Sequence, residues 1–167
     1  MDLEPKPVAP LAAAGRRIGV IADTHGVLRP QAREALVGSE LIIHAGDVGS
    51  LEVLQQLESI APVVAVRGNV DVQPWASNFP ESRVVEVGEA RVYVVHDLEQ
   101  LDLDPSAAGM AAVVCGHTHV AVIEERNGVL YVNPGSAGPR RFHHPVSVAV
   151  LTVAGALVTA ELVELET

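Results

Sequence analysis

The chain has few aromatic residues, few basic residues and almost no cysteine. Aromatic side chains make up 3% of its 167 residues and apolar residues 49%, so its core must be built from Val, Ile, Leu and Ala. Such a core suits strands covered by helices better than an aromatic binding platform. The 11 basic residues face 21 acidic ones, and the formal charge of −10 argues against non-specific binding to nucleic acid or to an anionic membrane surface.

Two further absences indicate where the protein works. Cys115 is the only cysteine, so no internal disulfide can form and a reducing compartment is expected. No apolar run approaches the length of a membrane span or of a signal-peptide core. We therefore expect a cytoplasmic protein with no membrane partner.

The length of the chain fits one domain with a substantial buried core. Residues 1–15 are rich in Pro and Ala and are predicted to form a poorly ordered tail. Residues 16–167 contain no internal repeat and no linker, so we expect them to form a single domain.

The first half of this domain alternates strand and helix patterns. A β-α-β-α-β order predicts a parallel sheet with right-handed crossovers. Strands are expected at 16–22, 41–44 and 62–66, and helices at 30–37 and after Ser50, a candidate helix cap.

The second half is rich in strand patterns. Two-residue turn signals separate pairs of apolar runs, which predicts hairpins. Residues 97–109 are expected to form a loop with a short helix after Pro105. The predicted fold class is α/β, with two mixed β-sheets packed as a sandwich and helices on the outer faces. Strands are expected at 83–87, 90–95, 111–115, 120–125, 129–132, 146–153 and 157–163.

Short polar signatures follow five of the apolar runs. They are Asp23-Thr24-His25, Gly46-Asp47, Gly68-Asn69-Val70-Asp71, His96 and Gly116-His117-Thr118-His119. Because polar residues that follow a buried strand lie at its carboxyl end, we expect the five to meet along one sheet edge. Carboxylates, an amide and imidazoles suit divalent metals, and seven such groups favour two ions over one. The sequence therefore predicts a dinuclear metal site for phosphoryl chemistry.

Each signature also has an ordinary structural interpretation, because Asp and Thr cap helices and Gly-Asn or Gly-Asp pairs form turns. Only the joint pattern supports the metal site. Asp71 either orients the site or accepts hydrogen bonds from turn amides. His44 either orients a ligand or has a backbone partner. The run Asn133-Pro134-Gly135-Ser136 is either a turn that lies near the site or, as we favour, a Pro-Gly turn that contributes shape alone.

Three other residues lie close in sequence to these signatures or to the 133–136 turn. Arg140 and Arg141 either bind a substrate phosphate or are ordinary surface residues. Cys115 lies in an apolar run and is interpreted as a buried core residue.

The order Asp-x-His, Gly-Asp, Gly-Asn, His, Gly-His-x-His resembles that of the calcineurin-like metallophosphoesterase superfamily. The resemblance spans about Arg16 to Val163 and is strongest to the small single-domain phosphodiesterases of the YfcE-like group. It implies that Asp23, His25 and His119 bind one ion. Asn69, His96 and His117 would bind the other, with Asp47 bridging the two.

The resemblance also implies a cofactor and a mechanism. The cofactor would be two divalent ions, Mn²⁺ first and Ni²⁺, Co²⁺, Fe²⁺ or Zn²⁺ as alternatives. A hydroxide bridging the ions would attack the phosphorus in line. We expect Asp47, Asn69 and His96 to take part in catalysis as well as in metal binding.

Two positions depart from the family pattern. Many members have a His after the Gly-Asn pair that can protonate the leaving group, and this chain has Val70 there. Its absence favours leaving groups that need little help, such as aryl esters or activated diesters. Asp97 stands where the small members usually have Gly, and an added carboxylate there would tighten cation binding or narrow access.

The predicted function is the metal-dependent hydrolysis of a small phosphate ester, most of all a phosphodiester. Alternatives are a protein-binding scaffold of the same fold, like the retromer subunit, and a phosphomonoesterase or phosphoprotein phosphatase. Exposed strand edges are also compatible with a homodimer.

Overall fold

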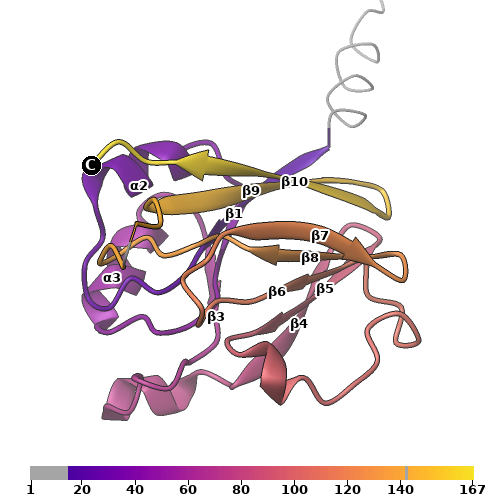
Figure 1. Cartoon of the computed structure of the whole chain (residues 1–167), viewed down its shortest axis with the longest axis horizontal. Helices are drawn as coiled ribbons and strands as arrows, with labels where there is room; N and C mark the ends of the chain where they lie inside the picture. Colours follow the sequence, from indigo (N-terminus) through magenta and orange to yellow (C-terminus); the bar gives the residue numbers. More distant parts are fainter. Residues whose placement is uncertain (1–14, 142) are drawn as a thin grey trace, which may run out of the picture.

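The computed structural model describes residues 15–141 and 143–167. Within these ranges the chain forms two α-helices and two five-stranded sheets (Figure 1). The predicted α/β sandwich with mixed strand directions is therefore confirmed. The predicted N-terminal tail, residues 1–15, lies outside the described residues except for Gly15.

The first sheet has the strand order β10-β9-β1-β2-β3. Its strands β1 (Arg16–Ile21), β2 (Leu41–His44) and β3 (Val63–Ala65) run parallel, as the alternating pattern predicted, and helices α2 (Pro30–Leu36) and α3 (Leu51–Glu58) connect them. Ile21 is paired with His44, and His44 with Ala65. The three strands therefore end level, so the segments that follow them start side by side. The hairpin of β9 (Ser147–Ala154) and β10 (Leu157–Glu164) adds to β1 antiparallel.

The second sheet has the order β4-β5-β6-β8-β7. The predicted hairpins are confirmed, one formed by β4 (Ser82–Val87) with β5 (Ala90–Val95) and one by β7 (Val122–Arg126) with β8 (Val129–Asn133). Strand β6 (Ala112–Val114) joins the two hairpins through parallel pairing with β5 and β8.

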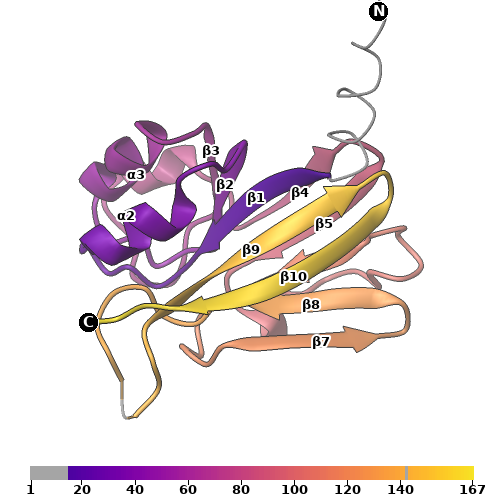
Figure 2. The ribbon, with the colours of Figure 1, turned by 90° about the horizontal axis from the view of Figure 1, so that it is seen from above.

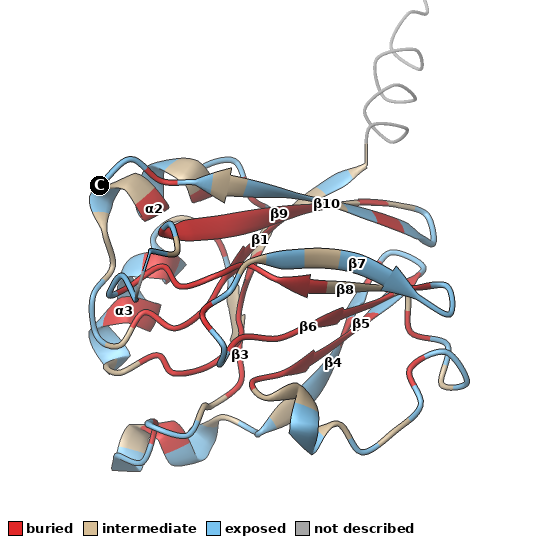
Figure 3. Ribbon diagram, viewed as in Figure 1, coloured by how far each residue is buried: buried red, intermediate tan, exposed pale blue. Residues whose placement is uncertain are grey.

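The core between the sheets consists mainly of Val, Ala, Ile and Leu side chains, as expected for a chain with few aromatic residues. In Figure 3 strands β6, β8 and β9 are buried along most of their length. Both helices cover the same sheet: Leu36 of α2 and Leu57 of α3 belong to one buried cluster with Ile42 of β2 (Figure 2).

The outer face of the second sheet is covered by irregular chain instead of a helix. Leu98, Leu101 and Leu103 pack there against Tyr93 and Val113. The segment includes a short 3₁₀-helix, η2 (Leu98–Gln100), and another 3₁₀-helix, η1 (Pro74–Asn78), follows β3.

Two local predictions were wrong in detail. Ser50 is the N-cap residue of α3, but its side chain makes no capping hydrogen bond. The helix predicted after Pro105 is a turn, closed by a bond from the Met110 N–H to the Pro105 carbonyl, because Gly109 adopts a φ of 78° and ends any helical path. Among the described residues, no helix is both long and apolar enough to span a membrane.

Candidate metal centre

The five polar signatures meet at one edge of the sandwich, where the carboxyl ends of strands from both sheets converge. Backbone bonds join the loops in pairs: the Asp23 N–H donates to the Gly46 carbonyl at 3.0 Å, and the His25 N–H donates to the Asp47 carbonyl at 3.0 Å. The Gly116 N–H donates to the His96 carbonyl at 2.9 Å. The first sheet thus supplies the carboxylates and one imidazole, and the second sheet supplies the other imidazoles.

The backbone of these loops is unusual. Six described residues other than glycine have a positive φ, and one of them, Asn127, is a hairpin turn residue. The other five are predicted site residues: Asp23, His25, Asp47, His117 and His119. This left-handed region is costly for most side chains and is common where function dictates the backbone.

Two carboxylates lie between two pairs of imidazoles. The ring centroids of His25 and His119 are 5.3 Å apart, and those of His96 and His117 are 5.2 Å apart. Asp23 Oδ1 lies 3.4 Å from His119 Nε2 and 3.9 Å from His25 Nε2.

Asp47 reaches one imidazole of each pair. Its Oδ2 lies 3.6 Å from His25 Nε2 and 3.3 Å from His96 Nε2. Asp23 Oδ1 also lies 3.9 Å from His96 Nε2, so each of the two carboxylates lies near an imidazole of both pairs.

The donor atoms fit a bound cation. Buried polar groups almost always have hydrogen-bond partners. Yet Asp23 Oδ1, His25 Nε2 and His96 Nε2 are buried and find none among the described residues. There are two sets of candidate ligands, and within each set the ligand atoms all lie within 4.8 Å of one another. The sets are Asp23–His25–His119 and Asp23–Asp47–His96. Divalent cations would satisfy these orphaned lone pairs.

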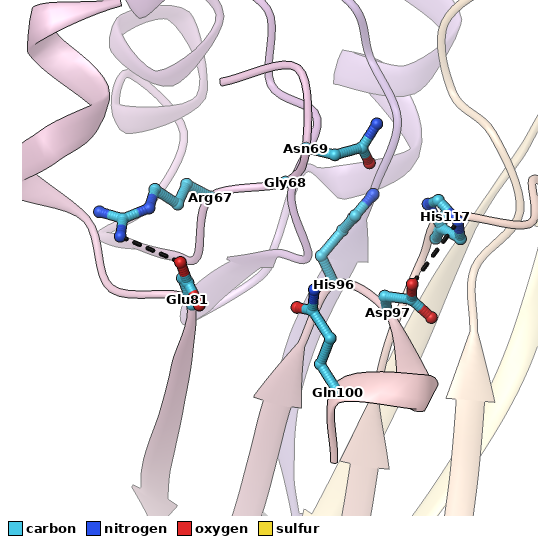
Figure 4. A pocket seen from close by; sticks show the side chains of 8 residues that line it. All are labelled: Arg67, Gly68, Asn69, Glu81, His96, Asp97, Gln100 and His117. Atoms are coloured by element: carbon cyan, nitrogen blue, oxygen red, sulfur yellow. Dashed lines mark hydrogen bonds and ion pairs between the residues drawn. The ribbon is translucent and has the colours of Figure 1, made fainter. Parts of the chain in front are cut away.

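The remaining two predicted ligands, Asn69 and His117, lie on the open side. Both are exposed, and they line a cavity of about 110 Å³ together with His96. Figure 4 shows the side chains of Asn69, His96 and His117 around this space. The cavity connects this half of the centre to solvent.

Glycine is required at two positions that pack against side chains of the site. A Cβ atom on Gly68 would lie 2.1 Å from Asp47 Oδ1, and one on Gly46 would lie 2.7 Å from the Nδ1 of His96. No side chain fits at either position without displacing a site residue, which explains why Gly precedes Asp47 and Asn69 in the two signatures.

Side chains behind the centre hold its loops. His96 Nδ1 donates to the Ala45 carbonyl at 2.8 Å, which leaves Nε2 as a lone pair facing the carboxylates. Asp71 accepts hydrogen bonds from the N–H groups of Val48, Gly49 and Gly68 at 2.8–3.1 Å. Asp71 therefore satisfies turn amides, and in doing so it joins the loops that carry Asp47 and Asn69.

His44 has both a backbone and a side-chain partner. Its Nδ1 accepts from the Gly46 N–H at 3.1 Å, so Nε2 carries the proton and lies 2.9 Å from Thr24 Oγ1. Burial lowers the pKa of His44 to about 3, so the ring stays neutral. Its two hydrogen-bond partners, Thr24 and Gly46, are the residues next to Asp23 and Asp47 in the chain.

Burial dominates the charge states within the centre. It raises the pKa of Asp23 to about 7, lowers that of His25, and lowers that of His119 to about 4. For Asp47 burial acts upward, but the nearby His96 keeps its pKa below the usual value. For His96 burial acts downward, but Asp47, the Ala45 carbonyl and Asp23 together raise its pKa overall. A bound cation would displace the protons that these groups hold.

Residues near the rim answer several questions left open by the sequence. The Arg140 guanidinium donates to Thr167 Oγ1 and is directed to the chain end. The charge of exposed Arg141 acts downward on the pKa of Asp23, His25 and His119, so this residue lies near the centre. Asp97 Oδ2 lies 3.7 Å from His117 Nε2. Cys115 is buried and unpaired, and burial raises its pKa to about 12.

The turn 133–136 does more than the sequence indicated. The Asn133 side-chain amide donates to the Gly116 carbonyl at 2.9 Å and to Thr118 Oγ1 at 3.1 Å. The Ser136 hydroxyl donates to the Asp23 carbonyl at 3.2 Å. These two side chains hold the loops that carry His117, His119 and Asp23, so the interpretation of the turn as shape alone was incomplete.

Comparison with known proteins places the chain in a family. The profile of the calcineurin-like phosphoesterase superfamily domain matches residues 17–156, and the chain belongs to this superfamily. It is 37% identical over 158 residues to a protein of Methanothermobacter thermautotrophicus named a probable metallophosphoesterase, covering 87% of this chain and 91% of that one. It is also 31% identical over 138 residues to a phosphodiesterase of Methanocaldococcus jannaschii, covering 71% of this chain and 82% of the relative.

A solved structure has the same fold. Vacuolar protein sorting 29 from Cryptosporidium parvum superposes with a TM-score of 0.72 at 25% identity, covering 92% of this chain and 99% of that chain. The same architecture therefore occurs in a protein named for sorting and in relatives named for phosphoester hydrolysis.

Proposed function

We propose that this protein is a phosphodiesterase that uses two divalent ions, with Mn²⁺ as the first candidate. The observation that carries this proposal is the pair of carboxylates between two pairs of imidazoles, with buried lone pairs that have no protein partner. Membership of the superfamily supports the reaction class, and the relative named a phosphodiesterase favours diesters.

In this proposal each residue has a defined task. Asp23, His25 and His119 would hold one ion, and Asn69, His96 and His117 would hold the other. Asp47 has an oxygen within 3.6 Å of an imidazole of each half and would serve as a ligand in both. When bound, the ions supply Lewis acidity, which lowers the pKa of water and offsets phosphate charge.

The rest of the chain sets what kind of ester can react. Arg141 lies near the centre and supplies a cation for a phosphate oxygen. Val70 is 38% exposed beside Asn69 and offers no proton to a leaving group. Esters whose leaving group departs as a stable anion should therefore react fastest.

A second candidate function is a protein-binding scaffold, which the similarity in fold to vacuolar protein sorting 29 favours. A scaffold has no need of imidazoles around a buried carboxylate oxygen that lacks a partner, or of five ligand-type residues in left-handed backbone. The phosphodiesterase accounts for these features, so we place it first.

The test is hydrolysis of bis-p-nitrophenyl phosphate by chelator-stripped protein, with and without added Mn²⁺. Restoration of turnover by the ion supports the proposal. Absence of turnover with Mn²⁺, Ni²⁺, Co²⁺ or Zn²⁺, in protein whose thermal unfolding is cooperative, would favour the scaffold.

A further inference from the structure

A second and larger cavity borders the open half of the metal centre. It has a volume of about 260 Å³ and shares Asp97 and His117 with the smaller cavity that reaches Asn69 and His96. The two cavities therefore border the same two side chains, Asp97 and His117. A molecule with its phosphate at the metal centre would have this cavity beside it.

The floor and walls of this cavity are largely apolar. Val122 of β7 and Tyr131 and Val132 of β8 line it from the second sheet, together with Cys115 and with Leu98 of η2. The Arg126 guanidinium lies over the Tyr131 ring, 4.5 Å from its centroid. A flat apolar group fits such a slot between a strand pair and a short helix.

The charges around the cavity select against anions. Asp97, Glu99 and Glu124 line it, and Arg126 is its only basic residue. That arginine is already paired with Glu124 through Nη2 and Oε1 at 2.6 Å. A second phosphate or a carboxylate placed there would face net negative charge without a free cation.

We propose that this cavity binds a neutral aromatic ester arm of the phosphodiester substrate, while the phosphate lies at the metal centre. The inference rests on the proposed function and narrows its substrate class. Diesters with an uncharged ring, such as an aryl group or a nucleobase, are accepted. Polyanions, including nucleic-acid strands, are disfavoured at this position, in agreement with the net charge of −10.

The test measures binding by calorimetry, using Mn²⁺-loaded protein with diphenyl phosphate and dimethyl phosphate as probes. Both carry the same charge and differ in the arms. We expect diphenyl phosphate to bind at least about tenfold more tightly, because an aromatic ring gains on that order when it leaves water.

Two variants test whether the preference for diphenyl phosphate arises in this cavity. Val122→Glu adds a charge at the cavity wall, and Val122→Trp fills the space. Each should remove most of the difference in affinity between the two probes. Val84→Glu is the matched control, since Val84 and Val122 are both 37% exposed on edge strands of the second sheet and Val84 does not line the cavity.

Equal affinity for the two probes, or a preference that both Val122 variants retain, would overturn the inference. Turnover of bis-p-nitrophenyl phosphate, measured on the same samples, separates the two proposals. An aromatic preference without turnover would leave the cavity assigned and the phosphodiesterase rejected, whereas turnover without the preference would do the reverse.

Discussion

The two halves of the centre differ in their access to solvent. Asp23 and His119 of the first half are 0% and 2% exposed, whereas the His117 side chain of the second half is 41% exposed and Asn69 is also exposed. Both cavities border the second half. His96, at 3% exposed, is the buried member of the second half. In the proposed function the closed half would retain an ion, and a substrate would meet the protein at Asn69 and His117.

The charge states of the imidazoles follow the same division. In the closed half burial lowers the pKa of both His25 and His119, so these rings are ready to act as neutral ligands. In the open half the pKa of His96 is raised by its neighbour Asp47. Among the imidazoles, protons should therefore compete with an ion most strongly at His96, whereas in the closed half they compete at Asp23, whose pKa burial raises to about 7.

The largest effect is expected from Asp47, because it belongs to both halves. Asp47→Asn keeps an oxygen for the bond that Oδ1 accepts from the Val70 N–H at 3.0 Å, so the fold should survive. Turnover of bis-p-nitrophenyl phosphate should fall by at least about 10²–10³-fold. The exposed Glu161→Gln on β10 serves as the control, and unchanged turnover in the Asp47 variant would refute its bridging role.

Next, variants that remove one ligand should change the Mn²⁺ affinity of one half and not of the other. Calorimetric titration of the chelator-stripped protein with Mn²⁺ should show two sites, the tighter one in the closed half. His119→Ala should weaken the tighter site, and Asn69→Ala the weaker one, each by at least about 10–100-fold. If either variant weakened both sites equally, the division into halves would be wrong.

Arg141→Ala tests the cation that lies near the closed half. Loss of an exposed cation for a phosphate oxygen should raise KM for bis-p-nitrophenyl phosphate by about fivefold with kcat little changed. Arg140→Ala is the matched control, because its guanidinium contacts Thr167. A fall in kcat with KM unaltered would instead assign Arg141 to the chemical step.

The smallest effect at neutral pH concerns His44, behind the closed half. Its folded-state pKa of about 3 lies below the ordinary 6.5, so the unfolded chain binds the additional proton between these values. This contribution to the free energy of unfolding is complete above pH 6.5 and falls by about 1.4 kcal/mol per pH unit as the medium is acidified. The difference in the free energy of unfolding between the ion-free protein and its His44→Asn variant should therefore decrease from pH 7.5 to pH 5. Urea titrations at the two pH values measure this difference, and a constant difference would contradict the prediction.

Most of the fold follows from local patterns. Apolar runs separated by Asn127-Gly128 or Gly88-Glu89 predict hairpins because two-residue turns leave few alternatives, and both form. Level strand ends bring the segments after β1, β2 and β3 together, as the parallel pattern predicted.

What the sequence could not predict depends on contacts between distant segments. That both helices cover one sheet is decided by Leu36 and Leu57 packing on Ile42, and no local pattern encodes this choice. Asn133 lies in a Pro-Gly turn, and only its approach to the Gly116–Thr118 loop gives its amide a role. The position of Arg141 near the centre, with Arg140 turned to Thr167, likewise requires the folded chain.

The left-handed backbone at the site residues has an evolutionary consequence. A residue other than glycine in this backbone region lowers the free energy of unfolding by on the order of 1 kcal/mol relative to glycine. Binding of an ion to its side chain would offset this cost. A descendant freed from metal binding would gain stability from glycine at His25, but not at Asp23, whose buried side chain accepts a hydrogen bond from the His117 N–H at 3.0 Å. A glycine in place of His25 would therefore mark lineages that have abandoned the chemistry while keeping the fold.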